Sequence, residues 1–136
     1  MQCTQSTVAL LSALTLCMSG GCALPEPSQP TVRGLADLLD QPAERALYDA
    51  LRAYDDGQYV PAETSLRLAL ASGLRSARDR ATAHKLLAFI TCTSQRLADC
   101  EAAFRAARDA DSSFALSRSE VGHPVWGPVY RRVSAP

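Results

Sequence analysis

Histidine is scarce in this 136-residue chain, which contains only His84 and His123. The two lie 39 positions apart, and neither has a carboxylate or a cysteine at ligand spacing, which disfavours a zinc site. The sequence also lacks a glycine-rich phosphate loop, a nucleophile elbow and a Ser/His/Asp set. We therefore expect no enzyme activity, no metal, no cofactor and no small-molecule substrate. His84 is predicted to be a packing residue, and His123 to bond a neighbouring backbone carbonyl.

Neither sign of charge predominates, since Lys and Arg together number 14 and Asp and Glu together number 14. Both signs are interspersed from Arg33 to Arg132, so no basic patch is available to neutralise phosphates, and we expect no nucleic-acid partner. Aromatic residues make up only 6% of the chain and β-branched residues are also sparse, whereas Ala and Leu dominate. This composition predicts an all-α fold.

A long hydrophobic run is also missing. The apolar stretch Val8–Met18 is 11 residues, too short to span a bilayer but typical of the core of a signal peptide. It ends in Ser19-Gly20-Gly21-Cys22, and small residues before a cysteine are what a bacterial lipoprotein signal peptidase requires. We therefore interpret 1–21 as a lipoprotein signal peptide and Cys22 as the lipidation site. The absence of Lys or Arg before Cys22 departs from the usual pattern, and ordinary secretion or a buried N-terminal helix are the alternatives.

The segment 22–31 follows this cysteine and contains Pro25, Pro27 and Pro30 with almost nothing apolar. Because proline fixes φ and donates no hydrogen bond, the segment is predicted to be an extended tether. Ala23 stands where aspartate would favour retention in the inner membrane. We therefore expect the lipid on Cys22 to hold the chain on the periplasmic face of a bacterial outer membrane.

The remaining residues, 32–136, predict one helical domain. A short helix is expected at Val32–Leu39. Four longer helices follow from apolar residues at helical spacing, with proline in the first turn of two of them and Ser76 with Asp79 as a cap for the third. They are expected to span Pro42 to Tyr54, Tyr59 to Ser72, Ser76 to Thr91 and Arg96 to Ala110.

The pattern of small and large apolar residues in these helices also repeats along the chain. The pattern Gly57-x-Tyr59-x-x-Ala62-x-x-x-Leu66-x-x-Ala69-Leu70 resembles the second half of a tetratricopeptide (TPR) repeat. The pattern Leu97-x-x-Cys100-x-x-x-Phe104-x-x-Ala107 has the same layout, with Cys100 in the place of Ala62. The offset of 38 residues exceeds the usual 34, so we expect a longer turn near 73–76. The sequence thus predicts about two TPR-like antiparallel helix pairs, and a generic four-helix domain is the alternative.

The C-terminal segment 112–136 contains Gly122, Pro124, Gly127 and Pro128, from which we expect an irregular strap rather than a regular helix. This strap is predicted to fold back over the last helix pair and bury part of Trp126. The alternative is a recognition epitope, because Trp and Tyr are favoured at the centres of interfaces. In that case the candidate partner-binding residues are Trp126, His123 and Tyr130.

Cys92 and Cys100 lie at the close of one predicted helix and early in the next. An antiparallel turn of about eight residues brings such positions into disulfide range, and the periplasm is oxidising. We expect a disulfide between them. Two buried thiols filling small-residue positions are the alternative.

Taken together, these features resemble the TssQ family of type VI secretion-associated lipoproteins. The matching elements are the following: Cys22, the repeat-like helices, Ala88-Phe89-Ile90-x-Cys92, Cys100-x-x-x-Phe104, Phe114-x-Leu116 and Glu120-x-Gly122-His123-Pro124-x-Trp126. The resemblance implies a TPR-like structural accessory of the secretion machine whose partners are envelope proteins of that system, and it implies no catalytic residues. The residues themselves predict a tethered protein-binding module. A pilotin-like lipoprotein that targets a secretin or pilus component is the alternative, and a small envelope enzyme is a third possibility.

Overall fold

The computed structural model describes residue 34 and residues 40–135. The described residues form six helices and no strand, so the predicted all-α fold class is confirmed. The helices are α2 (Pro42–Asp55), α3 (Tyr59–Ala71), α4 (Ala77–Thr93), α5 (Leu97–Ala110), α6 (Arg118–Val121) and α7 (Gly127–Ser134). The predicted signal peptide 1–21, Cys22, the tether 22–31 and nearly all of the predicted helix Val32–Leu39 lie outside the described residues.

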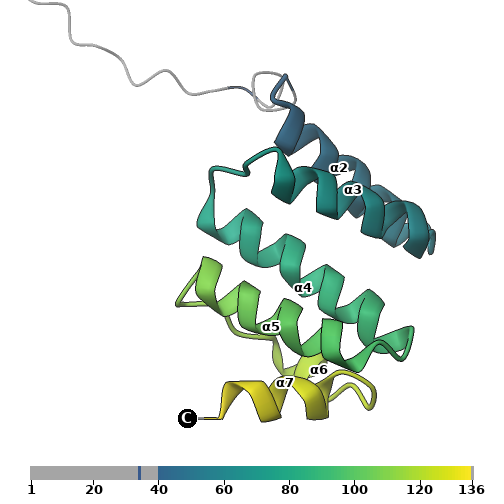
Figure 1. The fold of residues 1–136 in the computed structure, drawn as a ribbon, viewed down its shortest axis with the longest axis vertical. Helices are drawn as coiled ribbons and strands as arrows, with labels where there is room; N and C mark the ends of the chain where they lie inside the picture. Colours follow the sequence, from purple (N-terminus) through teal and green to yellow (C-terminus); the bar gives the residue numbers. More distant parts are fainter. Residues whose placement is uncertain (1–33, 35–39, 136) are drawn as a thin grey trace, which may run out of the picture. The chain divides into compact units, whose positions relative to one another are not determined.

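The four long helices pack as two antiparallel pairs in a TPR-like arrangement, α2 with α3 and α4 with α5 (Figure 1). Neighbouring pairs are joined by the packing of α3 against α4, and α7 then packs against α5. The inner helices α3, α4 and α5 therefore each bury one apolar stripe against their own partner and another against the next element, whereas α2 packs against α3.

The helices begin and end at the residues that the sequence marks. Pro42 occupies the first turn of α2, where no amide donor is lost. The hydroxyl of Ser76 accepts a hydrogen bond of 3.2 Å from the Asp79 amide at the start of α4. Five residues separate α3 from α4, whereas three separate the helices within each pair. The longer turn predicted near 73–76 is thus confirmed.

The two repeats place equivalent residues in the core. Six positions of the repeated pattern have no solvent-exposed surface, three in each copy: Ala62, Leu66, Ala69, Cys100, Phe104 and Ala107. The small residue at the first of these positions lets the helices approach closely, and the larger one a turn later fills the space between the pairs.

The turns inside the two pairs are equivalent as well. Gly57, after α2, has a φ of 73°, and Gln95, after α4 and 38 positions later, has a φ of 61°. The same type of amide-to-carbonyl hydrogen bond closes each turn, at 2.7 Å in the first and 2.8 Å in the second. Both helices therefore end in the left-handed conformation that glycine adopts without steric cost, but only the first turn has glycine there.

This difference yields a prediction. Replacing Gln95 by glycine should raise the free energy of unfolding by about 0.5–1 kcal/mol, because it removes the side-chain crowding of a left-handed residue. The reciprocal change, Gly57→Gln, should lower it by a similar amount. Urea unfolding of both variants measures the two effects, and a loss of stability on Gln95→Gly would contradict the equivalence of the turns.

The C-terminal segment 112–136 contains two short helices, α6 and α7, where an irregular strap was predicted. A capping box formed by Ser117 and Glu120 starts α6, and Pro128 occupies the first turn of α7, where it costs no hydrogen bond. Gly127 starts α7 so close to α6 that an added Cβ would lie 2.3 Å from the carbonyl oxygen of Val121. The prediction of irregularity was wrong for α6 and α7, since Gly127 and Pro128 begin a helix rather than interrupt one, and it holds for the turn between them, where Gly122 ends α6 and Pro124 follows. The expected packing over the last helix pair is found, since α7 covers α5.

Candidate functional site

Trp126 lies between the C-terminal helices and the second pair. Its ring stacks on Phe89 of α4 with centroids 4.2 Å apart and on His123 with centroids 3.3 Å apart. The indole N–H donates a hydrogen bond of 3.0 Å to the carbonyl oxygen of Glu120. The expected burial of Trp126 against the helices is therefore observed, and its ring surface is largely covered within the chain.

Tyr130 and His123, the other predicted partner-binding residues, also make contacts within the chain. The Tyr130 ring packs edge-on against Phe104 at 5.3 Å, and its hydroxyl accepts a hydrogen bond of 3.3 Å from the Leu116 amide. The Nδ1 atom of His123 accepts a hydrogen bond of 3.2 Å from the Val125 amide. The prediction that His123 bonds a backbone carbonyl was thus wrong, because the turn after Pro124 presents an amide to the ring instead.

An aromatic crevice of about 200 Å³ opens beside Trp126. Its walls come from the end of α2, the start of α3, the last turns of α4 and the turn between α6 and α7, and it is lined by Tyr54, Tyr59, Phe89, Ile90, Thr93, His123 and Trp126. Of the predicted partner-binding residues, His123 and Trp126 line this crevice, whereas Tyr130 does not. The structure thus adds aromatic residues from both helix pairs to the predicted C-terminal ones.

Sequence reasoning missed Tyr54, Tyr59 and Phe89 as site residues. Tyr54 lies on the apolar stripe of α2, and Tyr59 occupies the bulky position after Gly57, so both were attributed to helix packing. Their rings do pack edge-on, with centroids 5.6 Å apart. Yet Tyr59 keeps 51% of its surface exposed. This exposure distinguishes Tyr59, which lines the crevice, from a buried core residue.

A second groove, of about 390 Å³, lies between α3, α4 and α5. Its floor includes His84, Leu87 and Thr91, and three alanines of α5 form one wall. Burial, and after it the charge of Arg80, lowers the pKa of His84. The half-buried His84 lies among these helices, in agreement with its predicted packing role.

Cys92 and Cys100 form a disulfide that joins the end of α4 to the start of α5. Their Cα atoms are 5.1 Å apart and both side chains are buried. The covalent link therefore lies in the second pair and braces the last turns of α4, which line the aromatic crevice.

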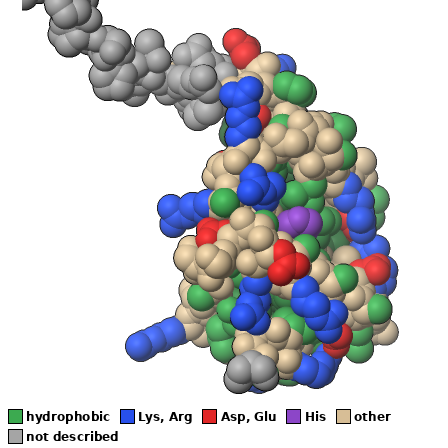
Figure 2. All heavy atoms as spheres, turned by 60° about the vertical axis from the view of Figure 1, so that its left-hand side comes forward, with side chains coloured by type: hydrophobic (Ala, Val, Ile, Leu, Met, Phe, Trp, Pro, Cys, Tyr) green, Lys and Arg blue, Asp and Glu red, His purple; other side chains and the backbone are tan. Residues whose placement is uncertain are grey.

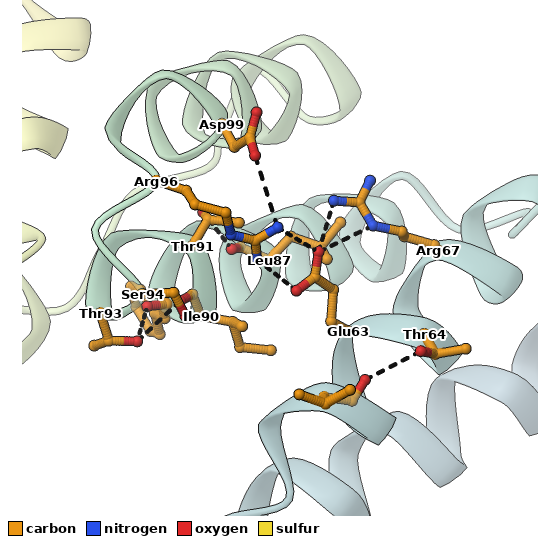
Figure 3. Close-up of polar contacts among 12 residues, drawn as sticks. Glu63, Thr64, Arg67, Leu87, Ile90, Thr91, Thr93, Ser94, Arg96 and Asp99 are labelled. Carbon is orange, nitrogen blue, oxygen red and sulfur yellow. Dashed lines mark hydrogen bonds and ion pairs between the residues drawn. The ribbon is translucent and has the colours of Figure 1, made fainter.

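Glu63 of α3 ties the two pairs together. Its carboxylate accepts hydrogen bonds from Arg67 on the same helix and from Arg96 at the start of α5 (Figure 3). These bonds lower the pKa of Glu63, with Arg96 as the main cause. Glu101 repeats the arrangement 38 positions later, between Arg105 and Arg132 of α7.

The ion pairs of Glu63 with Arg67 and Arg96, here called the Glu63 clasp, make the stability of the fold depend on pH. The pKa of Glu63 is lower in the folded than in the unfolded chain, so its ionised form stabilises the fold above the ordinary pKa of a glutamate side chain. This stabilisation should disappear as the pH falls through the lowered value of the folded state. Glu63→Gln should therefore lose stability at pH 7 relative to the wild type and match it more closely in acid. Thermal unfolding from pH 3 to pH 7 tests this, with the exposed Asp49→Asn as the control; equal losses at both ends would contradict it.

Figure 2 shows basic and acidic side chains interspersed around hydrophobic ones on the face in view. No three metal-ligating side chains gather among residues 40–135, and no helix in that part of the chain is long and apolar enough to cross a bilayer. Comparison with protein-family models, with curated proteins and with solved structures finds no match.

Proposed function

We propose that this chain is a membrane-anchored TPR-like adaptor, a scaffold or assembly accessory of the type VI secretion envelope complex that acts by binding a partner protein. The main support for binding is the aromatic crevice, where side chains from both helix pairs and from the turn between α6 and α7 converge. Clefts lined by aromatic side chains between packed helices are common protein-recognition surfaces. The resemblance to the TssQ family supports the assignment to secretion.

The adaptor role also agrees with the way the fold is braced. Three links join successive elements. Glu63 of α3 pairs with Arg96 before α5, Glu101 of α5 pairs with Arg132 of α7, and the disulfide joins α4 to α5. A surface held by such links is preorganised, so a partner that binds it loses less entropy in ordering the site. We propose that a lipid on Cys22 places this surface at the periplasmic face of the outer membrane.

Site-specific photo-crosslinking in the native lipoprotein tests the function. A photoreactive side chain replaces Val125, which is 42% exposed beside Trp126, or Leu68, which is 57% exposed on α3 and outside both crevice and groove. We expect capture of membrane subunits of the secretion machine from position 125 and not from position 68. Capture of a secretin or pilus component would favour the pilotin-like alternative, and equal capture from both positions would contradict a specific surface.

The anchor is tested separately. Cys22→Ser should keep its precursor mass, whereas Cys17→Ser, in the same N-terminal segment, should be processed as the wild type is. A Cys22→Ser chain that is processed and membrane-bound like the wild type would refute lipidation at this position.

A further inference from the structure

The 38-residue repeat extends to the first helix of each pair, α2 and α4. Ala43 and Ala50 of α2 are buried, and the residues 38 positions later in α4, Ala81 and Ala88, are buried alanines as well. Two small buried residues at matching positions show that α2 and α4 turn equivalent faces toward the core. Their other faces are therefore equivalent too.

Two apolar residues of α2 differ from their equivalents in exposure. Leu86 and Phe89 of α4 are 6% and 5% exposed, whereas the residues 38 positions earlier, Tyr48 and Leu51, are 47% and 37% exposed. Tyr48 and Leu51 are three positions apart and so share one side of α2, here called the α2 stripe. An apolar surface that is buried in the second pair is thus open in the first.

On α4, the end of the chain covers this surface. Trp126 stacks on Phe89, and Lys85 donates a hydrogen bond of 2.8 Å to the carboxylate of Glu120. Within the described part of the chain the α2 stripe has no such cover, since both of its residues remain exposed. The counterpart of the C-terminal segment, for the first pair, is the sequence that precedes α2.

That preceding sequence has an apolar face of its own. In the segment 32–39 the residues at positions 32, 35, 36 and 39 are apolar. This spacing places them on one side of a helix. The segment lies outside the described residues apart from Gly34, and it ends where the described helical domain begins, at Asp40.

The length of the segment fits the α2 stripe. Only residues 40–41, which form a turn, separate it from the start of α2. Eight helical residues are about 12 Å long, and Tyr48 and Leu51 lie about 9 Å and 14 Å along α2 from its first residue. A helix that runs antiparallel to α2 from this turn therefore brings Leu35 to Tyr48 and Val32 to Leu51.

The charges of the two elements are complementary in the same register. Asp37 lies opposite Arg45, and Arg33 lies opposite Asp49, both of which are exposed on α2. Each charge of the segment thus meets a charge of opposite sign. Such exposed pairs contribute little stability, but they favour this register over one in which like charges meet.

We propose that the segment 32–39 forms a short helix that packs antiparallel on the α2 stripe, as the C-terminal segment packs on α4. The two ends of the chain then cover equivalent faces of the two helix pairs. This contact lies within one chain, so the inference does not depend on the adaptor function. It makes the α2 stripe unavailable to a partner and leaves the aromatic crevice open.

Hydrogen exchange followed by mass spectrometry tests this contact in the full chain, solubilised in detergent. The backbone amides of 35–39 should exchange at least about tenfold more slowly than in a free peptide of the same sequence. Leu51→Ser should bring their exchange close to that of the peptide. Leu68→Ser, the same change at an exposed position of α3, should leave it slow. Unprotected amides in the wild type, or equal effects of the two variants, would overturn the proposal.

A double-variant cycle identifies the two sides of the contact. Leu35→Ser and Leu51→Ser should each lower the midpoint of thermal unfolding by about 4–8 °C. Combined, they should lower it no further than the larger single change, because either one already displaces the segment. The changes at Leu35 and Leu68 should instead add. Additive losses for Leu35 with Leu51 would show that the two residues do not meet.

Dilution separates this contact from one between two copies of the chain. Protection of residues 35–39 should be the same over a tenfold range of protein concentration, because an intramolecular contact does not depend on it. Protection that is lost on dilution would assign the α2 stripe to a second copy and overturn the proposal. Neither outcome depends on which protein is captured from position 125.

Discussion

Phe104→Ala should lower the free energy of unfolding by about 3–5 kcal/mol, a large loss for a single substitution. The Phe104 side chain is fully buried on α5, and its ring packs edge-on against Phe89 of α4 and Tyr130 of α7. Its removal leaves a cavity at the point where the second pair meets the closing helix. Guanidinium unfolding followed by circular dichroism measures the loss.

The repeat provides a matched comparison for this change. Leu66 occupies the equivalent position in the first pair and is also fully buried, so Leu66→Ala should cost about 2–5 kcal/mol. Leu68→Ala, at an exposed position on the same helix, should change stability by less than about 0.5 kcal/mol. If Phe104→Ala does not fold, Phe104→Leu should show a smaller loss of the same sign. A change at Phe104 as small as that at Leu68 would contradict its place in the core.

Reduction of the Cys92–Cys100 disulfide should lower the free energy of unfolding by about 2–3 kcal/mol. The bond closes a short loop, with a sequence separation of 8, and removing it restores conformational freedom to the unfolded chain. Unfolding of the wild type with and without a reducing agent measures the difference.

A double variant isolates the contribution of the bond. Cys92→Ala/Cys100→Ala removes the link, and alanine at position 100 matches Ala62 of the first repeat. This variant should unfold like the reduced wild type and should not respond to reductant. A wild type whose unfolding is unaffected by reductant would show that the two cysteines are not linked in solution.

Much of the fold is predictable from local sequence signals. The proline of α2, the Ser76 cap and the glycines after α2 and α3 act within one turn of the chain, so the bounds of the four long helices follow within a few residues. The 38-residue repetition then predicts which helix faces meet. Similarity between the two copies is informative because each pair needs the same buried stripe.

The C-terminal helices show where local signals fail. Gly127 and Pro128 break a helix when they lie inside it and are tolerated when they begin it, and the local sequence does not separate these cases. The packing of α7 on α5, through Phe104 and Tyr130, selects the helical arrangement. The energy that decides the structure in this segment comes from long-range burial.

The candidate site also combines residues that the sequence points out with residues that only the fold reveals. Trp126 and His123 attract notice in the sequence because aromatic residues are few, whereas Tyr54 and Tyr59 look like ordinary packing residues of the first pair. Only the return of the chain after α5 brings Trp126 to α4 and thereby sets His123 and Trp126 in one crevice with the two tyrosines.

The sequence by itself thus determined the helical class, the pairing of helices and the positions of the small and large residues in each repeat, because these depend on periodicity and on interactions within a few turns. Tertiary structure alone decided that the C-terminal segment forms a closing helix and that an aromatic crevice opens beside it. Those features depend on contacts between residues far apart in the sequence, such as Lys85 with Glu120, whose energies no local pattern encodes.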